Sequence, residues 1–170
     1  DNAKSTVEER RTARLDLMFG RLAKTTDERR ARRIARHIMR RLNQSGSDTI
    51  DFLMTRAGDR VKAKDYAKAL DLLDGVVRLR PEFAEGWNRR ATVHFIMGNY
   101  GQSIADIEQV LRREPRHWGA LSGLSLILVS MERKLDALAV MNRALEVHPY
   151  LPRMKERRDR LMLEIDGADI

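Results

Sequence analysis

The strongest constraint on the fold is a pattern of residues that returns every 34 positions between residues 50 and 151. In the second half of each unit, a large residue, a small residue, two apolar residues and a closing proline recur at the same spacing. These positions are Tyr66, Ala69, Leu73, Val76 and Pro81 in the first unit, Tyr100, Ser103, Ile107, Val110 and Pro115 in the second, and Lys134, Ala137, Met141, Ala144 and Pro149 in the third. The period therefore defines three units, 50–83, 84–117 and 118–151.

Each unit is predicted to contain two antiparallel helices. The first half holds a large apolar residue and, four positions later, a small one, as in Trp87 and Ala91, and this spacing puts both side chains on one helix face. A break such as Gly98–Asn99 separates the two halves, and the proline ends the second helix because the residue before it leaves the helical region. The repeat and the abundance of helix-forming residues predict an all-α fold.

The repeating residues resemble those of the tetratricopeptide repeat (TPR) family. The middle unit matches the family pattern best, at Trp87, Ala91, Gly98, Tyr100, Ile107, Val110 and Pro115. The third unit departs from the pattern because Lys134 replaces the aromatic residue. This resemblance implies a right-handed superhelical solenoid of antiparallel helix pairs. It also implies a non-catalytic scaffold for protein–protein interaction.

The N-terminal residues 1–46 are predicted to form an Arg-rich, degenerate TPR-like helix pair. One period ahead of the first unit, Phe19 falls in register with Leu53. Two capping-box patterns predict that the helices of this pair span about 6–24 and 27–44. We therefore expect one continuous solenoid that begins with an atypical pair.

The C-terminal residues 152–166 are predicted to form a capping helix. One apolar stripe is expected to face the last unit, formed by Leu151, Met154, Leu161, Met162 and Ile165. The charged residues between them would face the solvent, because the last element of a solenoid needs a polar outer face.

The resemblance places a concave groove along the first helices of the three units. The predicted partner-groove residues are Met54, Val61, Asn88, Arg89, Thr92, Phe95, Ser122 and Leu126. An extended or helical segment of another protein would lie on them, although packing against neighbouring helices is the alternative for each residue. One family subtype binds the C-terminal carboxylates of chaperones through Lys, Asn and Arg. At the matching positions of this chain only Arg89 could serve, which argues against that function.

Positive charge is concentrated at the N-terminus, where residues 1–46 carry +7 of the total net charge of +8. A basic surface is predicted on the second N-terminal helix, formed by Arg29, Arg33, Arg36 and Arg40. A solvated charged face is one interpretation. The alternative is an anion-binding module for an acidic protein, an anionic membrane surface or nucleic acid. Nucleic acid is favoured least, because no aromatic residues are interleaved for base stacking.

Catalytic chemistry is not indicated by any residue pattern. The chain has no cysteine, and its four histidines show no metal-ligand spacing. The serines have no nearby histidine base in the pattern. We therefore expect no enzyme activity, no metal, no cofactor and no small-molecule substrate.

A second resemblance concerns the N-terminal part. The segments 15–23 and 43–47, on either side of the Arg-rich helix, look like a group of exported alphaproteobacterial TPR proteins. This resemblance implies a signal peptide, a periplasmic location and a role in cell-envelope integrity. A chain that starts at Asp1 fits cleavage after an Ala-type site, and a cytoplasmic location is the alternative.

Overall fold

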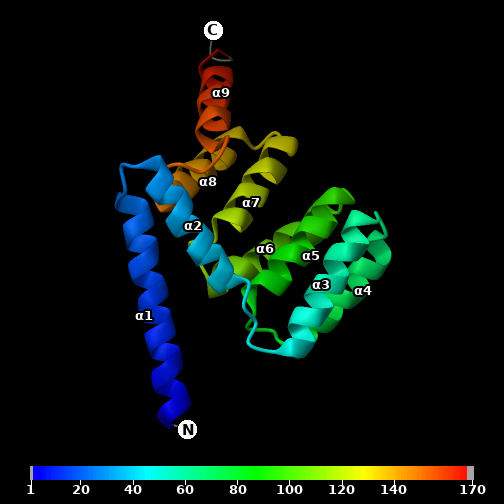
Figure 1. Cartoon of the computed structure of the whole chain (residues 1–170). Coiled ribbons are helices and arrows are strands. Elements are labelled where there is room, and N and C mark those ends of the chain that lie inside the picture. The colour runs from blue at the N-terminus through cyan, green and yellow to red at the C-terminus, as the bar shows by residue number, and fades with distance from the viewer. Residues whose placement is uncertain (1, 168–170) are drawn as a thin grey trace.

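The computed structural model describes residues 2–167, with side chains from residue 9 onward. This part of the chain consists of nine α-helices joined by short turns (Figure 1). The helices are α1 (Asn2–Lys24), α2 (Glu28–Leu42), α3 (Asp48–Lys62), α4 (Tyr66–Leu79), α5 (Ala84–Ile96), α6 (Tyr100–Arg113), α7 (Trp118–Ser130), α8 (Lys134–Val147) and α9 (Met154–Asp166). Within residues 2–167, no helix is both long and apolar enough to cross a membrane.

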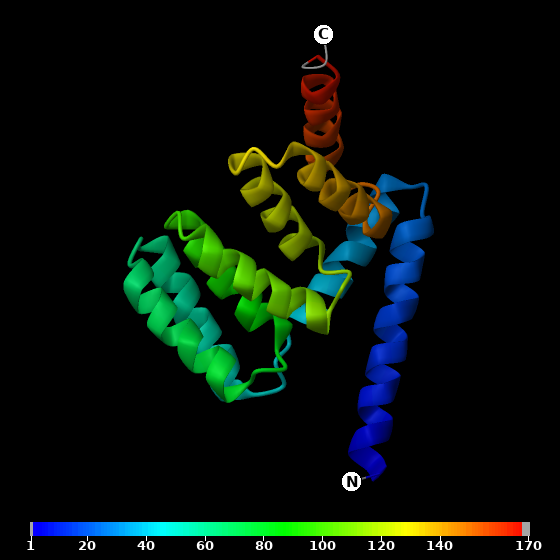
Figure 2. The same ribbon diagram turned by 180° about the vertical axis from the view of Figure 1, so that it is seen from behind.

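Three helix hairpins, α3–α4, α5–α6 and α7–α8, correspond to the three predicted units and stack in chain order (Figures 1 and 2). The turn inside each hairpin has the same backbone geometry. Its central residue has a positive φ, which is 58° at Lys64, 75° at Gly98 and 58° at Glu132. The next N–H then bonds to a carbonyl five residues back, as from Asn99 to His94 at 2.8 Å. The 34-residue period is thus a period of backbone conformation.

Small residues allow the helices of this stack to approach closely. Ala57, Ala91 and Ser125 occupy the predicted small position of the first helices, and all three are buried. At Gly86, a Cβ atom would lie only 2.7 Å from Val76 Cγ1, so the contact between α4 and α5 requires glycine there. These small residues therefore allow the close packing between neighbouring helices.

The N-terminal pair α1–α2 packs across the third repeat. Phe19 of α1 meets Trp118 of α7 edge to face, with ring centroids 5.9 Å apart. The Tyr150 hydroxyl donates to the Thr26 carbonyl at 2.6 Å, and Arg116 pairs with Asp16 at 2.8 Å. The two predicted helices exist, and Phe19 and Leu22 of α1 and Ala31 and Ile38 of α2 are buried. The register of Phe19 with Leu53 predicts that this pair stacks ahead of the first unit. The contacts with Trp118, Tyr150 and Arg116 instead place it against the third repeat.

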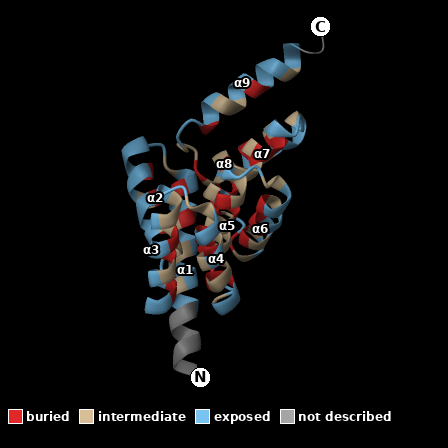
Figure 3. Ribbon diagram, turned by 90° about the vertical axis from the view of Figure 1, so that its right-hand side faces the viewer, coloured by how far each residue is buried: buried red, intermediate tan, exposed pale blue. Residues whose placement is uncertain are grey.

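The C-terminal helix α9 packs on α8, and its Met154 and Leu161 side chains are buried. Most of its ribbon is coloured as exposed (Figure 3). Most of its other described residues are exposed, as a terminal cap requires. The prediction that Met162 faces the core is wrong. It is 43% exposed, because it lies about 100° around the helix from the buried Leu161.

Candidate functional site

The first helices α3, α5 and α7 carry all the predicted partner-groove residues. These helices lie on the same side of the stack, facing the viewer in Figure 1, while α4, α6 and α8 lie behind them. We call this side the first-helix face. The two halves of this face differ. A buried polar network lies at the N-terminal ends of α5 and α7.

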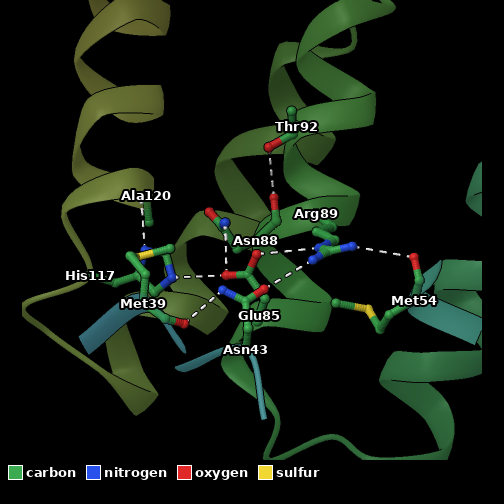
Figure 4. A network of polar contacts seen from close by, with 9 residues as sticks. All are labelled: Met39, Asn43, Met54, Glu85, Asn88, Arg89, Thr92, His117 and Ala120. Carbon is green, nitrogen blue, oxygen red and sulfur yellow. Dashed lines mark hydrogen bonds and ion pairs between the residues drawn. The ribbon is translucent and has the colours of Figure 1, made fainter. Parts of the chain in front are cut away.

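Glu85, at the start of α5, is the centre of that network and is 5% exposed (Figure 4). Its carboxylate accepts hydrogen bonds from Asn88 Nδ2 at 3.1 Å, from Arg89 Nε at 3.4 Å and from His117 Nε2 at 3.2 Å. A buried carboxylate is stable only when such donors satisfy it. Glu85 therefore joins the second repeat to the start of the third.

His117 is fully buried and caps the N-terminus of α7. Its Nδ1 atom accepts the backbone N–H of Ala120 at 3.1 Å, so that nitrogen carries no proton. The ring proton must then lie on Nε2, which donates to Glu85. Gly119 leaves room for this ring, since a Cβ atom there would lie 3.1 Å from His117 Cε1. His117 thus connects a helix cap to a buried carboxylate.

Arg89 extends the network to the N-terminal part of the chain. Its Nη1 donates to the Met54 carbonyl at 3.3 Å, and its Nη2 donates to Asn43 Oδ1 at 2.9 Å. Asn43 follows α2, so one guanidinium joins the N-terminal pair, the first repeat and the second repeat. Arg89, the only residue at the clamp positions that could bind a partner's carboxylate, is therefore already hydrogen-bonded within the fold through both terminal nitrogens.

The remaining predicted groove residues differ in how far they are exposed and in what they contact. The prediction that Met54 faces a partner is wrong, since its side chain is 5% exposed and packs in the core of the first repeat. Thr92 and Ser122 donate their hydroxyls to carbonyls one turn earlier in their own helices, at 2.9 and 2.7 Å. Val61, Phe95, Leu126 and Ser122 are half-buried, and Thr92 is exposed. The partly accessible apolar residues therefore lie on the C-terminal halves of the first helices.

A second polar cluster surrounds Trp87. Its ring lies between the guanidinium groups of Arg90 and Arg113, at 5.0 and 5.1 Å from the ring centroid. Arg90 also binds the buried Asp106 through two hydrogen bonds of 2.8 and 2.6 Å, which raises the pKa of Arg90. The repeat pattern does not indicate this cluster, because Asp106 has no acidic counterpart 34 residues away. It stabilises the second repeat.

Trp118 lies at the contact between the N-terminal pair and the third repeat. It is 8% exposed, and its ring packs edge to face against Phe19 and against the ring of His148. Burial lowers the pKa of His148. Trp118 thus anchors the N-terminal pair to the third repeat.

The predicted basic surface is exposed on α2. Arg29, Arg33, Arg36 and Arg40 all point away from the buried Ala31 and Ile38, as the apolar stripe requires. Within the described residues, no group of three His, Cys, Asp or Glu side chains could hold a metal ion.

Comparison with known proteins identifies the architecture. The tetratricopeptide repeat family model matches residues 89–152. A TPR repeat-containing protein of Rhizobium etli is 42% identical over 154 residues, covering 91% of this chain and 76% of the relative. The Sgt2 TPR domain from Aspergillus fumigatus has a TM-score of 0.67 at 21% identity, covering 72% of this chain and 83% of that domain. The first TPR of Spaghetti, bound to an HSP90 peptide, has a TM-score of 0.67 at 15% identity, covering 71% and 98%. The chain belongs to the tetratricopeptide repeat family, whose fold is a scaffold for protein interactions.

Proposed function

We propose that this protein is a non-catalytic scaffold that binds a segment of another protein on the C-terminal halves of α3, α5 and α7. The observation that carries this proposal is the accessibility of Phe95 and Leu126 on a face whose other half is closed by the Glu85 network. Peptide complexes of structurally similar TPR domains support it, since the Spaghetti domain is bound to an HSP90 peptide.

The chemistry of this half of the face favours an apolar anchor in the partner. Phe95 packs against Tyr100 with ring centroids 5.8 Å apart, which holds the ring in a fixed position. Leu126 lies on the adjacent first helix α7, and Thr92 adds an exposed methyl and hydroxyl beside them. A partner side chain inserted between Phe95 and Leu126 would gain affinity from burial, as binding hot spots do.

The test is a pair of charge insertions on opposite sides of the stack. Leu126→Asp places a carboxylate in the proposed site, whereas Leu79→Asp places one at a 63%-exposed leucine on the second helix α4. In pull-downs from native cell extract, we expect Leu126→Asp to lose a partner that the unchanged protein and Leu79→Asp both retain. Equal recovery of every partner by both variants would remove the first-helix face from consideration.

We further propose that the partner is an envelope protein, that the protein acts in the periplasm, and that it supports cell-envelope integrity. The resemblance of segments 15–23 and 43–47 to exported TPR proteins supports this location, and the relative from Rhizobium etli fits a bacterial origin. A tagged product of the complete gene should fractionate with periplasmic markers, and deletion of the gene should increase sensitivity to detergent. Recovery in the cytoplasmic fraction would favour the alternative location.

A further inference from the structure

A basic cleft lies between α1 and α2, separate from the first-helix face. Its volume is about 650 Å³, and four arginines and a histidine line it. The arginines are Arg14 and Arg21 of α1 and Arg40 and Arg41 of α2, and three apolar side chains, Leu17, Met18 and Ile34, also line the cleft. None of the lining residues is acidic. Of the predicted basic surface, only Arg40 takes part.

This cleft continues into a second cavity of about 410 Å³ at the open end of the N-terminal pair. The two share Arg14, Met18, Arg41 and Gln44, and the second cavity adds Arg80 and Arg113 from the ends of α4 and α6. It also contains Glu82, which pairs with Arg80, and Glu114, so the uncompensated positive charge belongs to the cleft between α1 and α2. Such a concave basic surface concentrates the electric field on an anionic ligand.

Within the described part of the chain, the four arginines of the cleft have no carboxylate partner. Among residues 9–167, no ion pair involves Arg14, Arg21, Arg40 or Arg41, whereas Arg116, which lies outside the cleft, pairs with both Asp16 and Glu114. Leu17, which also lines the cleft, is 64% exposed. Unpaired guanidinium groups around exposed apolar side chains are the features that a ligand carrying both carboxylates and apolar groups would satisfy.

We propose that the cleft binds an acidic amphipathic helix of a partner protein. Apolar side chains of that helix would cover Leu17 and Ile34, while its carboxylates would pair with the arginines at the rim. Nucleic acid fits less well, because no Phe, Tyr or Trp side chain lines the cleft for base stacking. A membrane surface also fits less well, because the arginines and apolar residues line a concave cleft between two helices.

The experiment measures binding of a defined probe to the full chain. The probe is a fluorescent helical peptide of about 16 residues with leucines along one face and glutamates beside them. A scrambled peptide of the same composition is the peptide control. We expect the helical probe to bind, the scrambled peptide to bind at least about tenfold more weakly, and added salt to weaken both.

Two double variants with the same change in charge locate the binding. Arg14→Glu with Arg41→Glu alters the cleft, and Arg29→Glu with Arg33→Glu alters the same N-terminal pair outside it. The cleft variant should weaken binding of the probe at least about tenfold, and the variant outside the cleft should weaken it much less. Leu17→Asp leaves every arginine in place and should also weaken binding of the probe. Circular dichroism checks that each variant folds.

Several results would overturn the proposal. These are failure of the helical probe to bind, equal binding of the scrambled peptide, or equal loss in both double variants. Tighter binding of a single-stranded oligonucleotide or an anionic vesicle through Arg14 and Arg41 would assign the cleft to another ligand class. Leu126→Asp should leave binding of the probe unchanged, so failure at the cleft and failure at the first-helix face are distinguishable.

Discussion

The turn between the two helices of each repeat adopts the left-handed backbone conformation three times, but only Gly98 is suited to it. Lys64 and Glu132 adopt it with φ values of 58°. All three residues are exposed, and a Cβ atom at Gly98 would meet nothing within 4 Å. Substitutions at these positions therefore change the backbone energy with little change in packing.

The expected magnitude follows from two opposing effects. A left-handed conformation costs a residue with a Cβ atom about 1–2 kcal/mol, which Lys64→Gly or Glu132→Gly would remove. Glycine makes the unfolded chain more flexible, which costs about 0.4–1 kcal/mol. Each substitution should therefore raise the free energy of unfolding by about 0.5–1 kcal/mol, and Gly98→Ala should lower it by a similar amount.

Urea and thermal unfolding followed by circular dichroism measure these changes. A gain of 1 kcal/mol corresponds to about 2–4 °C in the midpoint for a chain of this length. The turns are separate sites, so Lys64→Gly with Glu132→Gly should give about the sum of the single effects. If both glycine variants are less stable than the unchanged protein, or if Gly98→Ala is more stable, the account of the turns is refuted.

Three further predictions concern the buried groups. Glu85→Ala leaves the buried His117 N–H without an acceptor and should cost about 3 kcal/mol in urea unfolding; a loss below about 1 kcal/mol would mean that water replaces the carboxylate. Trp118→Ala should cost about 3–5 kcal/mol and abolish hydrogen-exchange protection in α1 and α2, whereas retained protection would show that Trp118 does not anchor them. The pKa of His148 lies below its ordinary value of 6.5, so the unfolded state binds more protons and stability should fall as the pH drops below that value. His148→Phe should reduce this slope of the unfolding midpoint between neutral and mildly acidic pH, and an unchanged slope would exclude His148 as its source.

The sequence predicted the repeat helices well because their pattern reports local geometry. The spacing of Trp87 and Ala91 and the break at Gly98 are consequences of helix period and backbone sterics, which neighbouring residues determine. The predicted ends of α1 and α2 agree with the structure to within a few residues for the same reason.

The contacts around Glu85 and Trp118 could not be predicted in this way. Arg89 meets Asn43 across 46 residues, and His117 meets Glu85 across 32, and neither distance is a multiple of the repeat. Trp118 is compatible with exposure or burial in the pattern of α7, and the choice depends on whether Phe19 reaches it. Pairing between side chains far apart in sequence depends on the complete fold, so the candidate site emerged only from the structure.

The anchoring of the N-terminal pair on the third repeat has a consequence for how the chain folds. In most solenoids each repeat contacts only its neighbours, so the ends can melt independently of the centre. Here the hydrogen bond from Tyr150 to Thr26 spans 124 residues, and it closes the chain into a ring of contacts. Closing so long a loop slows folding, but it makes α1 and α2 unfold together with the third repeat in one cooperative transition.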